Sequence, residues 1–578
     1  MMTKIKAIVT NHQRLVLIIM FAVLSLFFVL PLAHTRVIYL GDDLPYHINR
    51  IQELADNLKQ GNWYPYLYTY HFHGVPFLLG AFYPQVTLMP LALLSLITNN
   101  YVIGIYLGIS FYTFLAMMIM YYVARRLDRT VFEAFITAVV FTFSACRTYD
   151  AYQRFALGEF LAMTFLVLAF YGLYALVKTN GKSGAIVLGI GLSLVMLSHV
   201  LSTFLCVILL IVELVVLIPA IQQWNKFIIG ISKAIGLFFA SAAIYVVPFL
   251  EQELYQAYAQ PSPRNLALGA QTFSQLLNNS LSNNLVNGYL LKTDQGMGIG
   301  LVLILVIIWG VVRFKNLQRL DKWLLVSGVL LAMTSTQLFP WNLLQRTPIS
   351  VIQFPTRLLP FATIALALLS GKALNEFANE LSAKVKANFV LKLITLLALV
   401  LGPWLGAIET YHASMKNQTG FIAWATFYNG KHYEGDRAVA DEWYWYIDQY
   451  IPKESQAYYK DVFNRDAIVD GEKTKLSKFT PISNGMIYQD VSLQSKENVL
   501  LPAPQYKNVY VYQNSKRLRV QNQNGLIKLP RTKQGNLILK YQPSLLDRAS
   551  MLTSIVTWLL VVLMGIKFIL RGRKTAHV

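Results

Sequence analysis

Two adjacent carboxylates, Asp42 and Asp43, are the residues of this sequence with the most evident chemistry. They follow directly after an apolar run at residues 15–32, so they are expected at the mouth of a membrane. A carboxylate in such a place can take a proton from a substrate hydroxyl, and two together can hold a divalent cation. We therefore treat both as candidate catalytic residues and as candidate ligands of Mg²⁺ or Mn²⁺.

A helix is predicted to begin at the acidic pair. Asp43 is a favourable N-cap residue, and Pro45 suits the first helical turn. At 100° per residue, one face of this helix is apolar and carries Leu44, Ile48, Ile51, Ala55 and Leu58. His47 and Arg50 lie near Asp43 at the edge of that face, so both are candidate substrate-binding residues. This helix is expected to lie on the membrane surface and to hold acid, imidazole and guanidinium together at the lipid–water boundary. The alternative is a plain capped amphipathic helix.

Further ionisable residues, and one glutamine, stand at the ends of apolar runs, where a polar or charged group is costly and often functional. The candidate substrate-binding residues among them are Asp150, Arg154, Glu159, His199, Gln353 and Arg357. A guanidinium binds phosphate through two parallel hydrogen bonds, so the two arginines, together with the histidine, are candidate phosphate partners. For each single position, a residue that caps a helix or reaches the interface is the alternative.

The composition is that of a membrane protein with many spans. Of 578 residues, 55% are hydrophobic, and the mean hydropathy is +0.45. Many apolar runs reach the roughly 17–25 residues that cross a bilayer, and we predict about twelve spans. The first run lacks a small-x-small cleavage pattern, so we interpret it as a retained signal-anchor. The two cysteines, Cys146 and Cys206, lie in apolar runs, which excludes a disulfide framework.

The basic residues set the predicted orientation. The net charge is +21, and Lys and Arg cluster in alternate loops, as the positive-inside rule expects of cytoplasmic loops. Because this rule accounts for much of the charge, nothing favours nucleic-acid binding. The spans then place both termini in the cytoplasm and the acidic loop at 35–98 outside. We predict a multi-pass membrane protein with a large external domain.

A long polar region before the last span predicts a separate domain. We divide the chain into a transmembrane domain at 1–408, an external domain at 409–547, and a final helix with a basic cytoplasmic tail at 548–578. In the later part of the external domain, short alternating runs are broken by Asn-Gly and Gln-Gly, which is typical of antiparallel hairpins. The predicted fold class is an α-helical polytopic membrane protein with an external β-rich domain, a β-sandwich or jelly-roll, before the last helix.

The order of several segments resembles a known class of membrane enzymes. One span is followed by the Gly-Asp-Asp loop and helix, then by Phe82-Tyr83-Pro84, then by a span that ends in Ala124-Arg125-Arg126-Leu127. This order resembles the clan C (GT-C) membrane glycosyltransferases, which include protein O-mannosyltransferases and lipid A aminoarabinose transferases. Three stretches look more closely like the bacterial membrane proteins catalogued as 6-pyruvoyl-tetrahydropterin synthase-related, namely Tyr152–Ala162, Leu197–Ser202 and Gln353–Arg357.

The resemblance implies roles for residues and a function. In clan C enzymes an aspartate of the first external loop acts as base or metal ligand, and a second acid commonly comes from the next external loop. Asp42 and Asp43 match the first position, and Asp150 or Glu159 the second. Adjacent aspartates depart from the Asp-x-Asp pattern, which leaves metal dependence open. The implied activity is that of a hexosyltransferase that moves a sugar from a polyprenyl-phosphate donor to an envelope glycopolymer, glycolipid or protein on the outer membrane face.

Two other functions stay open. A non-enzymatic flippase or exporter of lipid-linked saccharide also needs an outward polar cavity, and a membrane scaffold could bind cell-wall polymer through the β-rich domain. A transporter is expected to carry polar residues through the midplane, whereas here they collect at one end of the spans. The sequence contains no Walker loop, Rossmann fingerprint, His-Glu-x-x-His or Gly-x-Ser-x-Gly motif, so ATP-driven transport, dehydrogenase, metalloprotease and hydrolase functions lack support.

Overall fold

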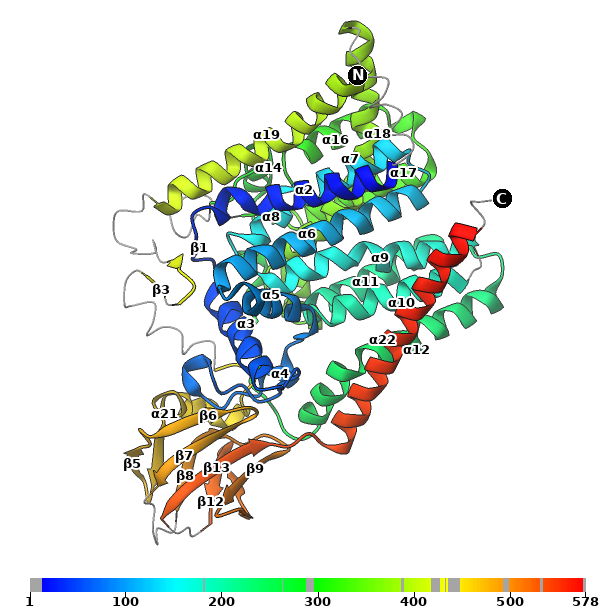
Figure 1. The fold of residues 1–578 in the computed structure, drawn as a ribbon. Coiled ribbons are helices and arrows are strands. Elements are labelled where there is room, and N and C mark those ends of the chain that lie inside the picture. Colours follow the sequence, from blue (N-terminus) through cyan, green and yellow to red (C-terminus); the bar gives the residue numbers. More distant parts are fainter. Residues whose placement is uncertain are drawn as a thin grey trace.

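The computed structural model shows a bundle of long helices with a β-rich domain at one end (Figure 1). It describes residues 13–179, 182–261, 263–286, 296–385, 389–416, 427–431, 433–434, 448–491, 498–530 and 534–574.

Among these residues, eight helices are long and apolar enough to cross a membrane. They are α2 (Gln13–Ala33), α6 (Tyr101–Arg126), α9 (Leu157–Thr179), α11 (Val200–Leu217), α12 (Trp224–Glu253), α18 (Leu359–Val385), α19 (Phe389–Lys416) and α22 (Leu545–Lys574). The bent pair α7 (Val131–Thr142) and α8 (Ala145–Ala151), with 45° between its halves, makes nine if it counts as one span. The predicted polytopic helical architecture is confirmed.

Three predicted spans are shorter than expected. α10 (Lys182–Met196), α16 (Leu301–Val312) and α17 (Arg319–Thr334) contain 15, 12 and 16 residues. At about 1.5 Å per residue, each is too short to cross a hydrocarbon core of about 30 Å at full thickness. The predicted total of about twelve therefore corresponds to helical segments, of which eight or nine have the length of a full span.

The segment between α2 and α6 folds across one end of the bundle. It contains α3 (Leu44–Lys59), η1 (Phe72–Gly74), α4 (Leu79–Phe82), η2 (Val86–Leu88) and α5 (Met89–Thr98). Most of the predicted apolar face of α3 is buried, but polar residues such as Glu53 and Asn57 are buried as well. Asn57 accepts a hydrogen bond from Ser483 of the β-rich domain, and Glu53 accepts one from the main chain of Thr69. Covered on both sides, α3 is an internal helix whose apolar face packs against other parts of the protein.

Short elements connect the later spans. They are η3 (Ile218–Ala220), α13 (Leu266–Gly269), α14 (Phe273–Ser282), η4 (Phe314–Asn316), η5 (Trp341–Leu344), η6 (Pro348–Ile352) and η7 (Pro355–Leu358). The last two precede α18 directly. Pro348 and Pro355 begin them, because proline favours the first turn of a helix.

The β-rich domain lies between α19 and α22, as predicted. It contains two five-stranded antiparallel sheets, which we call sheet 1 and sheet 2. Sheet 1 has the order β10 (Lys516–Arg517), β9 (Val509–Gln513), β13 (Gly535–Tyr541), β7 (Gly485–Val491), β6 (Phe479–Ile482). Sheet 2 has the order β11 (Gln521–Gln523), β12 (Leu526–Leu529), β8 (Val499–Pro504), β4 (Asp466–Val469), β5 (Glu472–Lys475). A small third sheet joins β1 (Ile38–Tyr39), β2 (Phe427–Tyr428) and β3 (Tyr433–Glu434).

The two large sheets share a core but differ in what covers their outer faces. Side chains such as Leu501 of sheet 2 and Leu539 of sheet 1 lie in one apolar cluster between the sheets. On its other face, sheet 2 packs Leu500 and Leu526 against the loop that carries Phe77 and against Val462 of α21 (Tyr459–Asn464), which follows η9 (Lys453–Tyr458). Every residue of β8 is consequently buried.

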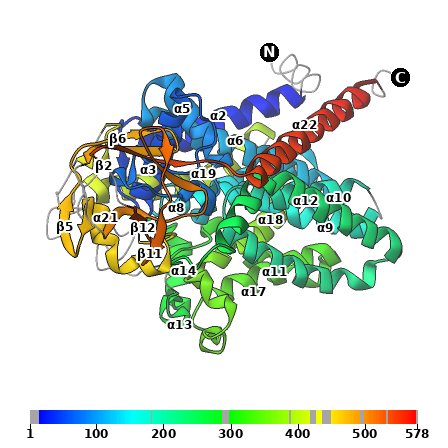
Figure 2. The ribbon, with the colours of Figure 1, turned by 90° about the horizontal axis from the view of Figure 1, so that it is seen from below.

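The β-rich domain lies at the opposite end of the bundle from the start of α2 and the end of α22 (Figures 1 and 2). Gln13 begins α2, and Lys574 ends α22, both far from the two sheets. Asp321 pairs with Arg129 and with Lys372 at 2.8 Å, which brings three predicted cytoplasmic segments together. This arrangement agrees with the predicted order of the spans. Which end faces the cytoplasm stays a prediction.

Candidate active site

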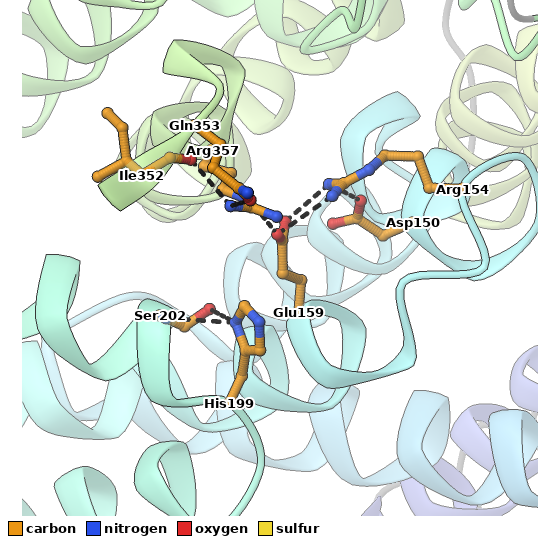
Figure 3. Close-up of polar contacts among 8 residues, drawn as sticks. All are labelled: Asp150, Arg154, Glu159, His199, Ser202, Ile352, Gln353 and Arg357. Carbon is orange, nitrogen blue, oxygen red and sulfur yellow. Dashed lines mark hydrogen bonds and ion pairs between the residues drawn. The ribbon is translucent and has the colours of Figure 1, made fainter. Parts of the chain in front are cut away.

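Glu159, in the first turn of α9, is the centre of a buried polar cluster (Figure 3). Its side chain is held by two guanidinium groups that approach from opposite sides. Arg154 donates from Nη1 to Oε2 at 2.8 Å and from Nη2 to Oε1 at 3.2 Å, and Arg357 donates from Nε to Oε1 at 2.6 Å. Such charge-assisted hydrogen bonds offset the cost of burying a carboxylate, which here is only 4% exposed.

Asp150 and Gln353 extend this cluster on either side. Asp150, on α8, accepts a hydrogen bond from Arg154 Nη1 at 3.0 Å. Gln353 Oε1 accepts one from Arg357 Nη1 at 3.0 Å, and the Ile352 carbonyl accepts a second at 2.8 Å. Gln353 has a φ of 61°, a left-handed conformation that is uncommon for residues other than glycine. This turn between η6 and η7 brings a side-chain and a main-chain acceptor onto one guanidinium.

The acidic pair docks onto the same cluster through the main chain. The Asp42 and Asp43 N–H groups donate to the Gln153 and Arg154 carbonyls at 3.3 and 2.8 Å. Gly41 permits this approach, because a Cβ at that position would lie 2.7 Å from the Gln153 carbonyl oxygen. The sequence Gly-Asp-Asp therefore places two carboxylates beside the ion pairs of the next polar loop.

Asp43 occupies the predicted N-cap position of α3, but its side chain makes no capping hydrogen bond. The predicted capping role is thus wrong, and the carboxylate is left for other contacts. Burial raises the pKa of Asp43 above its ordinary value, while the positive charges of Arg154 and Arg357 act in the opposite direction. A carboxylate with a raised pKa is a better proton acceptor when ionised, as a general base requires.

His47 and Arg50 form a second group, adjacent to the first. Arg50 Nη1 lies 3.3 Å from His47 Nδ1, and its guanidinium stacks over the ring of Tyr83 at 4.1 Å from the centroid. Arg50 is 2% exposed, and its buried Nε has no hydrogen-bond partner among the described residues. Burial, followed by the charge of Arg50, lowers the pKa of His47 well below its ordinary value, so this imidazole is neutral near pH 7.

His199 joins the two groups. It is the N-cap of α11, where its Nδ1 accepts from the Ser202 main chain at 3.2 Å and lies 2.8 Å from the Ser202 hydroxyl. Its ring is 6.0 Å from that of Tyr83, and Figure 3 shows it on the helix next to Glu159. Gly158 leaves room for both rings, because a Cβ there would lie 2.7 Å from the Tyr83 hydroxyl.

The structure thus gathers the predicted residues into two adjoining groups, with Asp42 on the exposed rim. Sequence reasoning missed two members. Tyr83 lies between Arg50 and His199, and its Phe-Tyr-Pro motif was a signal that could have identified it. Gln153 is 1% exposed, and its side-chain amide has no hydrogen-bond partner among the described residues. The only sequence signal for Gln153 is that it precedes Arg154.

The two carboxylates of the acidic pair are the candidate donors for a metal ion. Among the described residues, no group of three or more His, Cys, Asp or Glu side chains is arranged to hold an ion. Mg²⁺ is often bound by one or two carboxylates and completes its shell with water and phosphate oxygens. Asp42 and Asp43 fit that mode of binding. A role for Mg²⁺ or Mn²⁺ stays a prediction.

Several solved structures resemble this chain weakly. No curated protein matches the chain. Among solved structures, the arabinofuranosyltransferase AftD from Mycobacteria has a TM-score of 0.44 at 13% identity, over 70% of this chain and 29% of that one. The Archaeoglobus fulgidus oligosaccharyltransferase has a TM-score of 0.37 at 12% identity, over 75% and 60%. ArnT from Cupriavidus metallidurans, bound to undecaprenyl phosphate, has a TM-score of 0.37 at 12% identity, over 70% and 73%.

A family model matches residues 81–407, which is more than half of the chain. The match contains Asp150, Arg154, Glu159, His199 and Arg357, and it begins after the acidic pair. The family is described as a 6-pyruvoyl-tetrahydropterin synthase related domain of a membrane protein. The description does not by itself assign pterin chemistry to the site described above. Pterin synthase uses a histidine zinc site, and the described residues contain no such group. The chain belongs to the membrane proteins of the 6-pyruvoyl-tetrahydropterin synthase-related family.

Proposed function

We propose that the protein is an inverting membrane glycosyltransferase that takes a sugar from a polyprenyl-phosphate donor on the outer face of the membrane. The observation that supports this proposal best is the docking of the acidic pair on the Arg154 loop. The Asp43 N–H to Arg154 carbonyl bond of 2.8 Å sets a carboxylate beside guanidinium groups at the end of the membrane helices. A base and phosphate-binding cations next to lipid are the groups that such a transfer requires.

In the proposed reaction, Asp43 takes the proton of an acceptor hydroxyl. The acceptor oxygen then forms a bond to the anomeric carbon, and the bond from that carbon to the phosphate oxygen breaks. The leaving phosphate keeps the electron pair and gains negative charge. Arg357 suits its stabilisation, because its Nη2 group has no hydrogen bond to a described residue while Nε and Nη1 are held in place. A divalent ion on Asp42 and Asp43 would offset the same charge.

Glu159 has a positioning role in this proposal. It fixes Arg154 and Arg357 in one orientation, so the two guanidiniums do not have to be ordered when the donor binds. Arg50, which is buried, has an unpartnered Nε and stacks over Tyr83, offers a third positive charge. The proposed acceptor is an envelope glycopolymer, glycolipid or protein, and the proposed location is the bacterial cell membrane.

The acidic pair gives the direct test. Asp42→Asn and Asp43→Asn keep the side-chain size but remove the charge, and loss of a general base typically costs about 10²–10⁴ in rate. Transfer from radiolabelled polyprenyl-phosphate sugars would be measured with the purified protein in lipid nanodiscs. Asp43→Ala is a matched control for stability, because its side chain makes no capping bond and its loss should leave the melting temperature nearly unchanged.

Two further measurements complete this test. If a metal takes part, activity should disappear in chelator and return with Mg²⁺ or Mn²⁺. If both Asn variants transfer sugar at the wild-type rate, the site assignment is wrong. Donor binding without transfer in the wild type would instead favour a flippase or exporter of lipid-linked saccharide.

A further inference from the structure

The outer face of sheet 1 is open and carries a defined set of side chains. In β9, Tyr510 and Tyr512 point away from the core, since they alternate with buried Val509, Val511 and Gln513. The ladder registers place Ile538 and Arg517 opposite Tyr512, Ile487 opposite Ile538, and Lys540 opposite Tyr510. We call this surface the Tyr510 face; it consists of Tyr510, Tyr512, Arg517, Ile538, Lys540 and Ile487.

Arg517 is already held in place on this face. Its guanidinium lies over the Tyr510 ring at 3.7 Å from the centroid, and the residue is otherwise exposed. A guanidinium stacked on an aromatic ring keeps its in-plane N–H groups free to bind a carboxylate or phosphate. Because the stack restricts the long side chain before any ligand binds, less conformational entropy is lost on binding.

The chain segment that carries most of the Tyr510 face is basic in sequence, although Lys507 within it pairs with Glu251 at 3.2 Å. Between residues 499 and 541 the sequence contains eight Lys or Arg and no Asp or Glu. The positive-inside rule explains the basic loops at the far end of the bundle, but this domain lies at the opposite end. A basic surface away from those loops indicates an anionic partner.

The exposed side chains argue against a lipid surface as that partner. In the described part of the domain, residues 448–491, 498–530 and 534–541, no large hydrophobic side chain is strongly exposed. Binding to a bilayer interface uses exposed Trp, Phe or Leu side chains that enter the lipid. The Tyr510 face instead offers two partly exposed phenol rings, each an apolar plane with a hydroxyl group. Such rings suit the C–H faces and hydroxyls of sugar rings.

We propose that the Tyr510 face binds an anionic glycan, a sugar chain that carries carboxylate or phosphate groups. The tyrosines contact sugar rings, and Arg517 and Lys540 pair with the anionic groups. The proposal names a binding site distinct from the candidate active site. It holds whether or not the polar cluster transfers sugar, and under the proposed function it identifies the class of acceptor that the domain retains.

Binding of defined polymers to the full-length protein tests the proposal. The protein would be placed in nanodiscs of uncharged phosphatidylcholine and titrated with polygalacturonate, with neutral dextran and with polyphosphate. We expect polygalacturonate to bind most tightly, with an affinity that falls as salt rises. Arg517→Gln combined with Tyr510→Ala should weaken it about tenfold or more, as for the central Arg and Tyr residues of other interfaces.

Matched variants separate the contributions. Lys475→Gln removes one exposed positive charge from β5 of sheet 2 and should leave the affinity nearly unchanged. Arg517→Lys keeps the charge but loses the planar stack, so its affinity should lie between wild type and Arg517→Gln. Melting temperatures of all variants verify that each is folded.

Three results would overturn the proposal. One is that Lys475→Gln lowers the affinity for polygalacturonate as much as Arg517→Gln does. Binding would then depend on the overall positive charge and not on the Tyr510 face. Another is polyphosphate binding as tightly as polygalacturonate with no effect of Tyr510→Ala, which would exclude sugar contacts. The last is Tyr510-dependent binding to phosphatidylglycerol vesicles that exceeds binding to the glycan, which would make the partner a membrane.

Discussion

Two buried glutamates within the same polar end of the molecule are neutralised in different ways. Glu53 of α3 is 0% exposed and accepts main-chain N–H groups of Thr69, Tyr70 and His71 at 2.8–2.9 Å. Glu159 of α9 is 4% exposed and accepts mainly from two arginines. Main-chain N–H dipoles surround the first carboxylate, and charged arginine side chains surround the second.

This difference separates a structural carboxylate from one in a candidate active site. N–H dipoles cannot leave Glu53 without unfolding the loop at 69–71, so its contacts hold that loop on α3. The guanidiniums at Glu159 can exchange a partner, because an arriving phosphate offers them equivalent oxygens. Burial raises the pKa of Glu53 despite its hydrogen bonds and the nearby His71, which again reflects a site closed to water.

The largest expected effect is that of Glu159→Gln. It leaves Arg154 and Arg357 buried without their main negative partner, and breaking a buried ion pair typically costs about 3–5 kcal/mol. The melting temperature in detergent should fall sharply. Added inorganic phosphate should restore part of the loss, because an anion can replace the carboxylate between the two guanidiniums.

Chloride at the same ionic strength is the control for that rescue. Glu53→Gln is the matched variant, and phosphate should not stabilise it beyond the effect on wild type. Equal rescue of both variants would mean that phosphate acts on the whole protein, and the contrast between the two glutamates would not hold.

The next effect is that of Glu53→Gln itself. The amide NH₂ group faces main-chain donors, so at least one buried N–H loses its acceptor, at a cost of about 1–3 kcal/mol. The rate of amide hydrogen exchange should rise at residues 69–71. It should stay unchanged at the main-chain amides around Glu159. Faster amide exchange at residues 150–159 instead would show that the loop at 69–71 and the Glu159 cluster are not independent.

Much of the fold could be predicted from the sequence, because long apolar runs and alternating strands are local signals. The break between α7 and α8 and the short α16 could not, since they depend on how neighbours cover the helix. The strand-rich pattern before the last helix predicted the β-rich domain, and Asn524-Gly525 joins the hairpin of β11 and β12. The hairpin predicted at Gln534-Gly535 is wrong, because β12 and β13 lie in different sheets.

The candidate active site could be predicted only in part, because only some of its residues have a local sequence signal. Charged residues next to apolar runs identified Glu159 and Arg357, because a charge there is costly without a partner. The roles of Tyr83 and Glu53 depend on contacts between segments far apart in space, which the sequence does not contain. The N-cap signal at Asp43 is correct in position, but its side chain makes no capping hydrogen bond.

The pH dependence of transfer would sharpen the comparison further. Asp43 must be ionised to act as a base, and its raised pKa places the acid limb of the rate profile above that of an ordinary aspartate. Arg357 lowers this pKa, so Arg357→Gln should raise it and move the limb to higher pH. Glu53→Gln should leave the limb in place. An unchanged limb in Arg357→Gln would mean that another group controls it.

The smallest expected effect on stability is that of substitutions at His199. This residue has either a structural role, as Glu53 has, or a role in substrate binding, as proposed for the Glu159 cluster. Its Nδ1 caps α11, and its ring lies beside Tyr83. Asn is a good N-cap residue, so His199→Asn should keep stability within about 0.5 kcal/mol, whereas His199→Ala should cost about 1 kcal/mol. If the imidazole contacts substrate, both variants lose transfer equally despite their different melting temperatures. If it only caps the helix, transfer follows stability, and His199→Asn retains nearly full activity.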